Sequence, residues 1–122
     1  MKKKIFFVDD DQDVLTITEL LLKGLGHEVL FANSGEKAIE IIKSTVSPKI
    51  DFMFLDLMMH GIDGFDVLEF MKNSNIQIPT IVQTGIIDNN DLKKAKNLGA
   101  IDYILKPYTR EDIKRLISKY MI

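Results

Sequence analysis

Five polar side chains of this 122-residue sequence stand at or just after the ends of short apolar runs. They are Asp9, Asp10, Asp56, Thr84 and Lys106. In an open α/β sheet, ligands bind in the crevice beyond the carboxyl ends of the strands. Because neighbouring strands lie only about 4.8 Å apart, side chains at these ends can converge on one small volume. The sequence therefore predicts three carboxylates, a hydroxyl and an ammonium group around a single pocket.

Three carboxylates in one crevice repel one another, and some would bind protons near neutral pH unless a cation separates them. Hard oxygen ligands in a chain without cysteine suit Mg²⁺ or Mn²⁺. A carboxylate beside such a cation is a competent nucleophile toward a phosphoryl group. A lysine ammonium and a threonine hydroxyl at the same place would stabilise the negative charge on the phosphoryl oxygens. These residues predict a metal-assisted aspartyl-phosphate site.

Short, mostly apolar runs predict the five strands that position these side chains. Continuous runs of this length are typical of strands that are buried on both faces of a sheet. The runs are Ile5–Val8, Val29–Phe31, Phe52–Leu55, Ile78–Val82 and Ile101–Leu105. The second run ends without an ionisable residue, which places it away from the pocket.

Helical periodicity predicts a helix after each strand. In the first helix Val14, Ile17, Leu21 and Leu25 recur at steps of three and four residues, and the helix is expected to end near Gly24–Gly26. The other predicted helices are one capped by Asn33 with Glu36 three residues later, one around Phe65–Met71, one around Leu92–Leu98, and one from Thr109 to Tyr120.

Five βα units without a long linker predict one domain over residues 1–122. The expected class is α/β, a single doubly wound (βα)5 domain with a five-stranded parallel sheet and helices on both faces. The strand order 2-1-3-4-5 is taken from the flavodoxin-like class, in which the crevice lies between the first and third strands.

Composition excludes several other kinds of protein. Hydrophobic residues make up 46% and charged residues 28%, as in globular domains. The count of 0 cysteines excludes disulfide scaffolds and thiolate metal sites, and a net charge of −2 offers no basic field for nucleic acid. The apolar run after Lys2–Lys4 is too short for a signal peptide or a membrane span. We expect a cytoplasmic domain that binds neither DNA nor a membrane.

Four motifs, taken together, resemble the receiver domain of two-component response regulators, the chemotaxis-regulator-like class. They are Val8–Asp11, Leu55–Gly64, Gln83–Gly85 and Tyr103–Pro107, in the family's order and at its spacing over essentially the whole chain. The resemblance implies that residues 1–122 form a receiver (response regulatory) domain, with no output domain in this chain.

The resemblance also implies roles for the acidic residues. Asp56 would be the phosphoacceptor. Mg²⁺, or Mn²⁺, would be held by Asp10, Asp56 and the backbone carbonyl of Met58, while Asp9 would assist through metal-bound water. Two adjacent acids exceed what one helix cap requires, which favours the site interpretation for Asp9 and Asp10. The neighbouring Asp11 is expected to cap the first helix instead.

Further roles follow from the same resemblance for residues around the phosphate. Lys106 would pair with the phosphoryl group, or with Asp56 in its absence. Thr84 would reach toward the phosphate, although Thr also bonds local backbone in turns. Tyr103 would rotate inward with Thr84, although an aromatic near a strand end is equally typical of core or rim. Three residues are expected to support the loops: Gly64, Gly85, which leaves room for the phosphate, and Pro107, which would follow a cis peptide bond.

His60 stands where the family pattern usually has proline. Losing the fixed φ of proline is expected to loosen the loop that supplies the Met58 carbonyl. Two interpretations remain open: a tolerated surface histidine, or a side chain whose protonated form changes the charge beside the site, because histidine titrates near pH ~6.5.

The implied function is Mg²⁺-dependent transfer of a phosphoryl group from a phosphohistidine to Asp56. The donor would be a histidine kinase or a histidine phosphotransfer protein. Phosphorylation of Asp56 would alter the face around the fourth helix, fifth strand and fifth helix, where a downstream protein target would bind. The domain would be a monomer or a phosphorylation-dependent homodimer. Such a domain assists its own phosphorylation but is not a turnover enzyme.

Other functions fit the sequence less well. A small haloacid-dehalogenase-like phosphatase would need an acid two residues after its nucleophile, where this chain has Met58. A flavin-binding domain would need phosphate-cradling amides where this chain has Asp9–Asp11. A constitutive docking domain would not need the acidic residues. A receiver domain cut from a longer transcription factor or hybrid kinase also remains open, although Met1–Lys4 and Lys119–Ile122 favour a stand-alone regulator.

Overall fold

A five-stranded parallel sheet forms the centre of the computed structural model, which describes residues 2–44 and 49–120. The order of its strands is β2-β1-β3-β4-β5, which confirms the predicted flavodoxin-like topology. The strands are β1 (Lys4–Val8), β2 (Glu28–Ala32), β3 (Phe52–Asp56), β4 (Thr80–Thr84) and β5 (Asp102–Leu105).

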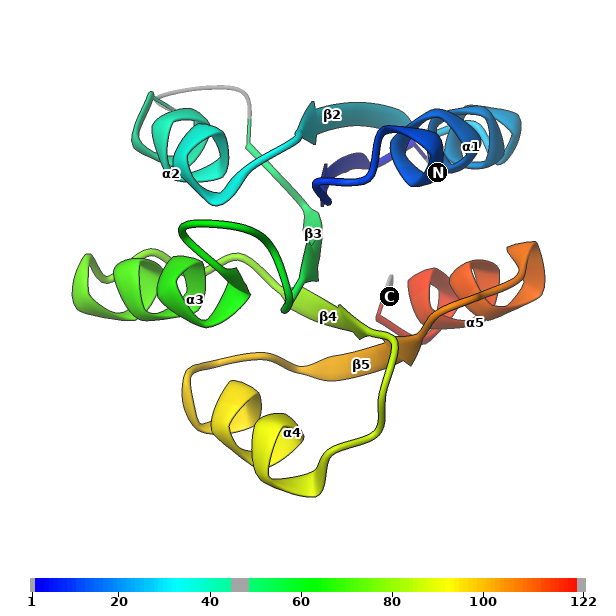
Figure 1. The fold of residues 1–122 in the computed structure, drawn as a ribbon. Coiled ribbons are helices and arrows are strands. Elements are labelled where there is room, and N and C mark those ends of the chain that lie inside the picture. Colours follow the sequence, from blue (N-terminus) through cyan, green and yellow to red (C-terminus); the bar gives the residue numbers. More distant parts are fainter. Residues whose placement is uncertain (1, 45–48, 121–122) are drawn as a thin grey trace.

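Helices cover both faces of the sheet, as the doubly wound α/β class requires (Figure 1). They are α1 (Gln12–Gly24), α2 (Gly35–Ser44), α3 (Gly64–Asn73), α4 (Asn89–Asn97) and α5 (Arg110–Tyr120). In Figure 1, α1 and α5 lie on one side of the sheet, while α2, α3 and α4 lie on the other.

Each face of the sheet carries its own hydrophobic core, because successive side chains of a strand point to opposite faces. Phe6 and Val8 of β1 belong to the cluster on the α2–α4 side. Ile5 and Phe7 belong to the cluster on the α1 and α5 side, where the rings of Phe7 and Phe54 stack with their centroids 5.5 Å apart. Burial on both faces explains why the central strands are continuous apolar runs.

The first helix confirms its prediction, but a neighbouring stripe of side chains is buried. Leu15, Thr18 and Leu22 face the sheet, whereas Ile17, which was predicted to lie on the apolar face, is 65% exposed. Val14 and Leu21 are partly buried at the edge of this face. The buried stripe and the predicted one have the same three- and four-residue spacing and are offset by one residue. The buried stripe was not recognised in the sequence because it contains the polar Thr18. The Thr18 hydroxyl lies 3.2 Å from the Tyr108 hydroxyl, which makes its burial acceptable.

Several predicted boundaries differ from the structure by one to three residues, and two of the differences have a clear local cause. Strand β4 begins at Thr80 rather than Ile78, because Pro79 has no N–H for a strand ladder, and it ends at Thr84, as predicted. Helix α2 is preceded by Ser34, whose hydroxyl accepts a hydrogen bond from the Lys37 N–H at 3.1 Å, so Ser34 rather than Asn33 is its cap.

Helix α4 is attached to the sheet by fewer buried side chains than the other helices. Ala95 is its one fully buried residue among those described. Two lysines link it to α3: the Lys94 Nζ lies 4.4 Å from the centroid of the Phe65 ring, and the Lys72 Nζ donates to the Asn97 carbonyl at 3.3 Å. Helix α4 therefore rests on its neighbour as much as on the sheet.

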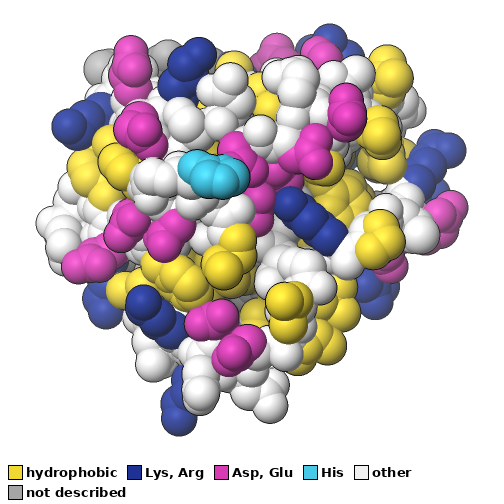
Figure 2. Space-filling view, viewed as in Figure 1, with side chains coloured by type: hydrophobic (Ala, Val, Ile, Leu, Met, Phe, Trp, Pro, Cys, Tyr) yellow, Lys and Arg dark blue, Asp and Glu magenta, His cyan; other side chains and the backbone are white. Residues whose placement is uncertain are grey.

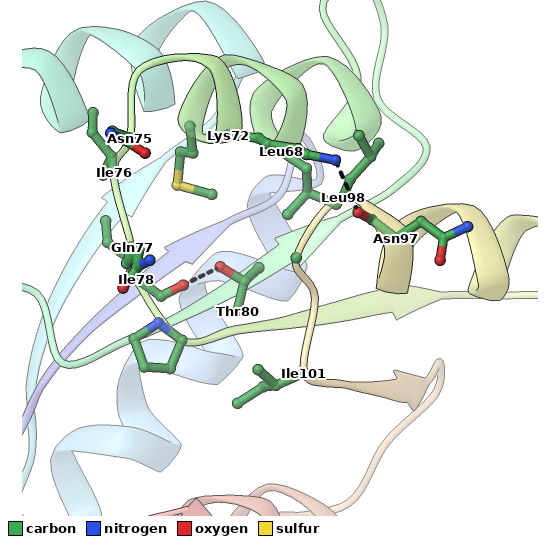
Figure 3. Close-up of a pocket in the computed structure, with 13 residues that line it drawn as sticks. Leu68, Lys72, Asn75, Ile76, Gln77, Ile78, Thr80, Asn97, Leu98 and Ile101 are labelled. Atoms are coloured by element: carbon green, nitrogen blue, oxygen red, sulfur yellow. Dashed lines mark hydrogen bonds between the residues drawn. The ribbon is translucent and has the colours of Figure 1, made fainter.

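A cavity of about 520 Å³ lies where α3 and α4 end and β4 begins (Figure 3). Ile76, Ile78, Leu98 and Ile101 contribute apolar surface to it. This cavity lies near the amino ends of β4 and β5, away from the end of the sheet where the predicted reactive side chains stand. It therefore does not belong to the predicted site.

Among the described residues, none of the helices has both the length and the hydropathy that crossing a bilayer requires. Met1, Met121 and Ile122, on which part of the expectation about the chain ends rested, lie outside the described residues.

Candidate functional site

The predicted acidic residues meet at the carboxyl edge of the sheet. Carboxylate oxygens of Asp9, Asp10 and Asp56 all lie within 4.8 Å of one another. Asp9 follows β1 and Asp56 ends β3, which are neighbouring strands, so the register of the sheet sets their separation. Figure 2 shows acidic side chains gathered near the middle of one face of the molecule, beside a histidine and a lysine or arginine.

Burial makes this cluster unusual for three acids. Asp9 is 0% exposed and Asp56 is 4% exposed, while Asp10 is exposed to solvent. A buried carboxylate is stable only when it is paired, hydrogen-bonded or bound to a cation. Among the described residues, Asp9 Oδ2 has an ion-pair contact with the Lys106 Nζ at 2.8 Å but no well-aligned hydrogen bond. Three hard oxygen donors, one of them open to solvent, fit a divalent cation such as Mg²⁺ or Mn²⁺.

The ammonium group of Lys106 places a positive charge against the acidic cluster. Its Nζ lies 2.8 Å from Asp9 Oδ2 and donates a hydrogen bond to Asp56 Oδ2 at 3.0 Å. The backbone N–H of Lys106 donates to the Thr84 carbonyl at 2.8 Å, which continues the β4–β5 pairing. The bond between Lys106 and Pro107 is cis, as the resemblance implied. The pairing of Lys106 with unphosphorylated Asp56 also matches the expectation.

The charges of these groups depend on one another. Burial and the nearby charge of Asp9 raise the pKa of Asp56 to about 6, although Lys106 opposes the shift. Burial alone would lower the pKa of Lys106, but its contacts with Asp9 and Asp56 outweigh burial and raise that pKa. Lys106 therefore stays charged at neutral pH, whereas Asp56 loses its proton only near pH 6.

Thr84 and Tyr103, which the resemblance assigned to the phosphate, do not take part in the hydrogen bonds described for this cluster. The Thr84 hydroxyl donates to the Ile86 carbonyl at 2.8 Å and accepts from the Ile86 N–H at 3.3 Å, which is the local turn that remained open for it. Tyr103 is 42% exposed. At Gly85, an added Cβ would meet no atom within 4 Å. The structure thus unites the four charged side chains without the hydroxyl or the aromatic ring.

The loop after Asp56 is held by several backbone contacts. The Met58 N–H donates to Asp56 Oδ1 at 3.2 Å, and the Met58 side chain is 68% exposed. The Gly64 N–H donates to the Leu57 carbonyl at 3.1 Å. A Cβ on Gly64 would overlap the Asp56 carbonyl oxygen and the Leu57 Cα. Helix α3 must therefore begin with glycine to approach this loop so closely.

His60 contacts the site although it is fully exposed. Its backbone N–H donates to Asp10 Oδ2 at 3.2 Å, and its ring Nδ1 lies 3.1 Å from the same oxygen. Burial alone would raise the pKa of Asp10, but these contacts with His60 hold it below its ordinary value. A proline at this position could make neither contact, because it lacks both the N–H and the imidazole ring.

Asp11 is the N-cap of α1, as expected, and its carboxylate accepts from the Asp13 and Val14 N–H groups. The sequence did not single out Gln83 as a separate site residue. It is 0% exposed and lies opposite Asp56 in the β3–β4 register. The available signal was a large polar side chain directly after the apolar pair Ile81 and Val82 of β4.

The order of the parallel sheet defines a flavodoxin-like domain. Its carboxyl edge carries a cluster of acids whose oxygens could bind a cation. Residues 5–118 match the response regulator receiver domain family. The chain is 34% identical over 117 residues to the response regulator SaeR of Staphylococcus aureus, covering 96% of this chain and 50% of SaeR. The chain belongs to the response regulator receiver domain family of two-component systems.

Solved structures agree on the fold. The Vibrio cholerae chemotaxis protein CheY4 superposes with a TM-score of 0.89 at 20% identity, over 98% of this chain and 99% of that one. The receiver domain of the Pseudomonas aeruginosa sensor histidine kinase PA1611, solved with magnesium in its active-site cleft, gives 0.86 at 21% identity, over 99% and 98%. The chain spans half the length of the curated relatives it matches.

Replacing Gly64 with alanine should destabilise the fold. Its Cβ would meet backbone atoms of Asp56 and Leu57, which cannot move aside without shifting β3. We expect Gly64→Ala to lower the free energy of unfolding in urea by about 1–3 kcal/mol. Gly85→Ala is the matched control, with a change within about 0.5 kcal/mol, because its Cβ enters open space. Equal stability of the two variants would contradict this account of the loop.

Asp56→Asn should stabilise the metal-free protein above pH 6. Because the folded-state pKa of Asp56 is raised to about 6, its protonated form favours folding, and this contribution is lost as pH rises from about 4 to 6. The variant should unfold at higher urea concentration than wild type at pH 7.5, by on the order of 1–3 kcal/mol, and the difference should vanish near pH 4.

Asp102→Asn is the control of opposite sign for this experiment. Burial alone would raise the pKa of Asp102, but hydrogen bonds from Tyr120, the Tyr103 N–H and Lys119 lower it. Its charged form therefore favours folding, and removing the charge should destabilise the protein at pH 7.5. If Asp56→Asn destabilises the protein as Asp102→Asn does, the assignment of repulsion to Asp56 is wrong.

Substitutions at His60 should separate its two contacts with Asp10. If a charged His60 ring modulates the site, His60→Ala should bind Mg²⁺ more tightly than wild type at pH 6, by no more than about fivefold for such an exposed pair. At pH 8 the difference should shrink. His60→Pro additionally removes the N–H that orients Asp10. Titration calorimetry between pH 5.5 and 8 measures the affinities, and identical pH profiles for all three proteins would rule out the modulating role.

Proposed function

We propose that this domain accepts a phosphoryl group on Asp56, in the presence of Mg²⁺, from a phosphohistidine of a histidine kinase or a histidine phosphotransfer protein. The observation that supports this most directly is the position of the buried Asp56 carboxylate, hydrogen-bonded to Lys106 and within 4.8 Å of the oxygens of Asp9 and Asp10. A nucleophile, a cationic partner and hard ligands for a cation thus share one small volume.

The reaction needs little beyond positioning. One Asp56 oxygen forms a bond to phosphorus while the bond from phosphorus to the histidine nitrogen breaks, and the electron pair stays on the imidazole. Lys106 already donates to the other side of this carboxylate and would follow the negative charge onto the phosphoryl oxygens. When bound by Asp10, Asp56 and the Met58 carbonyl, with Asp9 assisting, the cation would neutralise charge between carboxylates and phosphate.

A loaded site would change the partners of Thr84 and Tyr103. The Thr84 hydroxyl donates its hydrogen bond to the nearby Ile86 carbonyl. A phosphate on Asp56 would be a stronger acceptor for this hydroxyl. Movement of Thr84 would leave space for Tyr103, which is 42% exposed. We propose that this shift alters the surface formed by α4, β5 and α5, where a downstream protein or a second copy of the domain would bind.

The proposal extends to the setting of the domain. It would act in the cytoplasm, would not bind DNA itself, and would be a signalling domain rather than a turnover enzyme. A net charge of −2 supports the absence of a DNA contact by the domain. Since the chain spans half of its curated relatives, partners of the whole protein depend on whether it stands alone or is part of a longer regulator or hybrid kinase.

Mass spectrometry after incubation with Mg²⁺ and a small phosphodonor such as acetyl phosphate should show one added phosphoryl group. Asp56→Asn should show none, because an amide lacks the nucleophilic oxygen, and chelation of Mg²⁺ should abolish labelling of wild type. Asp63→Asn is the matched control on the same loop and should label normally, because Asp63 caps α3 outside the cluster. Equal labelling of Asp56→Asn and wild type would refute the proposal.

The same sample distinguishes a small phosphatase from a receiver. A phosphatase would release phosphate continuously from a generic phosphomonoester, whereas a receiver would give single-site labelling without such turnover. No acid stands two residues after Asp56 to protonate a leaving group, since Met58 occupies that position. A receiver that served only as a constitutive docking domain would give neither labelling nor turnover.

A further inference from the structure

Gln83 is a fully buried polar residue beside the phosphorylation site. It lies in β4 at the position opposite Asp56 of β3 and Ile104 of β5, and it is 0% exposed. Because side chains alternate along a strand, Gln83 points to the same face as Ile81, which belongs to the core on the α1 and α5 side. By the same alternation Asp56 shares this face with Phe54. Gln83 and Asp56 are therefore neighbours on one side of the sheet.

Two hydrogen bonds connect Gln83 to the strands that carry the aspartates. Its carbonyl oxygen accepts from the N–H of Leu57, the residue after Asp56, at 3.1 Å. Its side-chain Nε2 donates to the carbonyl of Val8, the residue before Asp9, at 3.2 Å. Since β3 lies between β1 and β4, the side chain reaches across the strand of Asp56 to hold the end of the strand that leads to Asp9.

The amide group is oriented by this contact at a cost. A carbonyl oxygen accepts only from a donor, so the Val8 carbonyl requires the NH₂ group of Gln83 to face it. The Gln83 Oε1 is then left buried, with no hydrogen-bond partner among the described residues. An unpaired buried acceptor is unfavourable, and an apolar side chain of the same shape would avoid the penalty. Local stability therefore does not account for a glutamine here, whereas a link to β1 does.

We propose that Gln83 is a positioning residue of the phosphorylation site, which fixes the end of β1 relative to β3 and so sets the spacing of Asp9 and Asp56 around the cation. This inference rests on the proposed function. The two buried carboxylates repel each other, and the strand ends that carry them would relax apart without a link. The Gln83 side chain adds such a link at the level of the carboxylates, where the strands end and the regular ladder stops.

The test is the Mg²⁺ affinity of Gln83→Met, which keeps the length and volume of the side chain but has no N–H donor. Thr80→Val is the matched control: Thr80 is a buried polar residue of the same strand, and its hydroxyl donates to the Ile78 carbonyl at the far end of the sheet. We expect calorimetric titration to show at least about a fivefold loss of Mg²⁺ affinity in Gln83→Met, the equivalent of one neutral hydrogen bond. Thr80→Val should bind Mg²⁺ within twofold of wild type, whatever its melting temperature.

A merely structural role for Gln83 predicts the opposite pattern. Both variants would then change in melting temperature while their Mg²⁺ affinities, measured well below those temperatures, stayed equal to that of wild type; this result would overturn the inference. Failure of wild type itself to bind Mg²⁺ would overturn the proposed function and the inference together. Binding by wild type with unchanged binding by Gln83→Met overturns the inference alone.

A measurement on wild type covers the case in which Gln83→Met does not fold. The Gln83 side-chain NH₂ hydrogens should exchange slowly with solvent in nuclear magnetic resonance spectra, because they are buried and bonded to the Val8 carbonyl. Slow exchange together with a change of their resonances on addition of Mg²⁺ supports the link. Exchange as fast as that of the exposed Gln12 side chain would refute it.

Discussion

Repulsion between two buried carboxylates is the constraint on which the rest of this site depends. Asp9 and Asp56 lie at the ends of neighbouring paired strands, at 0% and 4% exposure, so the sheet holds them close together. Such a pair is unfavourable in a medium of low polarity unless positive charge is close. Lys106 supplies one charge, and its ammonium contacts both acids. One monovalent group facing two or three carboxylates leaves a net negative site, which is a physical reason for it to bind a divalent cation.

The position of Lys106 follows from the same sheet. Strand β5 pairs with β4, the neighbour of β3, so a lysine just beyond the end of β5 reaches over β4 to the carboxylates of both Asp56 and Asp9. Asp56 Oδ2 therefore accepts from Lys106, while Asp56 Oδ1 accepts from the Met58 N–H. Chain topology thus brings a positive charge from the end of β5 to the acids at the ends of β1 and β3.

Much of the fold could be predicted, because all five strands contain short, mostly apolar runs that the sequence shows, even though β2 and β5 at the edges are only partly buried. The buried stripe of α1 could not, since Thr18 is polar in the sequence and is accepted in the core only through the Tyr108 hydroxyl from a distant loop. At the site, the gathering of Asp9, Asp10, Asp56 and Lys106 followed from strand ends. The contact of His60 with Asp10 depends on loop geometry, which spacing does not encode.

Helix α4 is attached to the sheet by few buried side chains, and this affects how a change of charge at Asp56 would alter the rest of the domain. Displacing α1 would bring the buried Leu15, Thr18 and Leu22 into water, whereas Ala95 is the one fully buried residue of α4 among those described. The free energy of such a movement rises with the apolar area that water must newly hydrate. Moving α4 therefore requires less free energy than moving a helix with several buried side chains. A change of a few hydrogen bonds at the site has a similar energy. Helix α4 is therefore the helix whose position we expect to respond most readily to such a change.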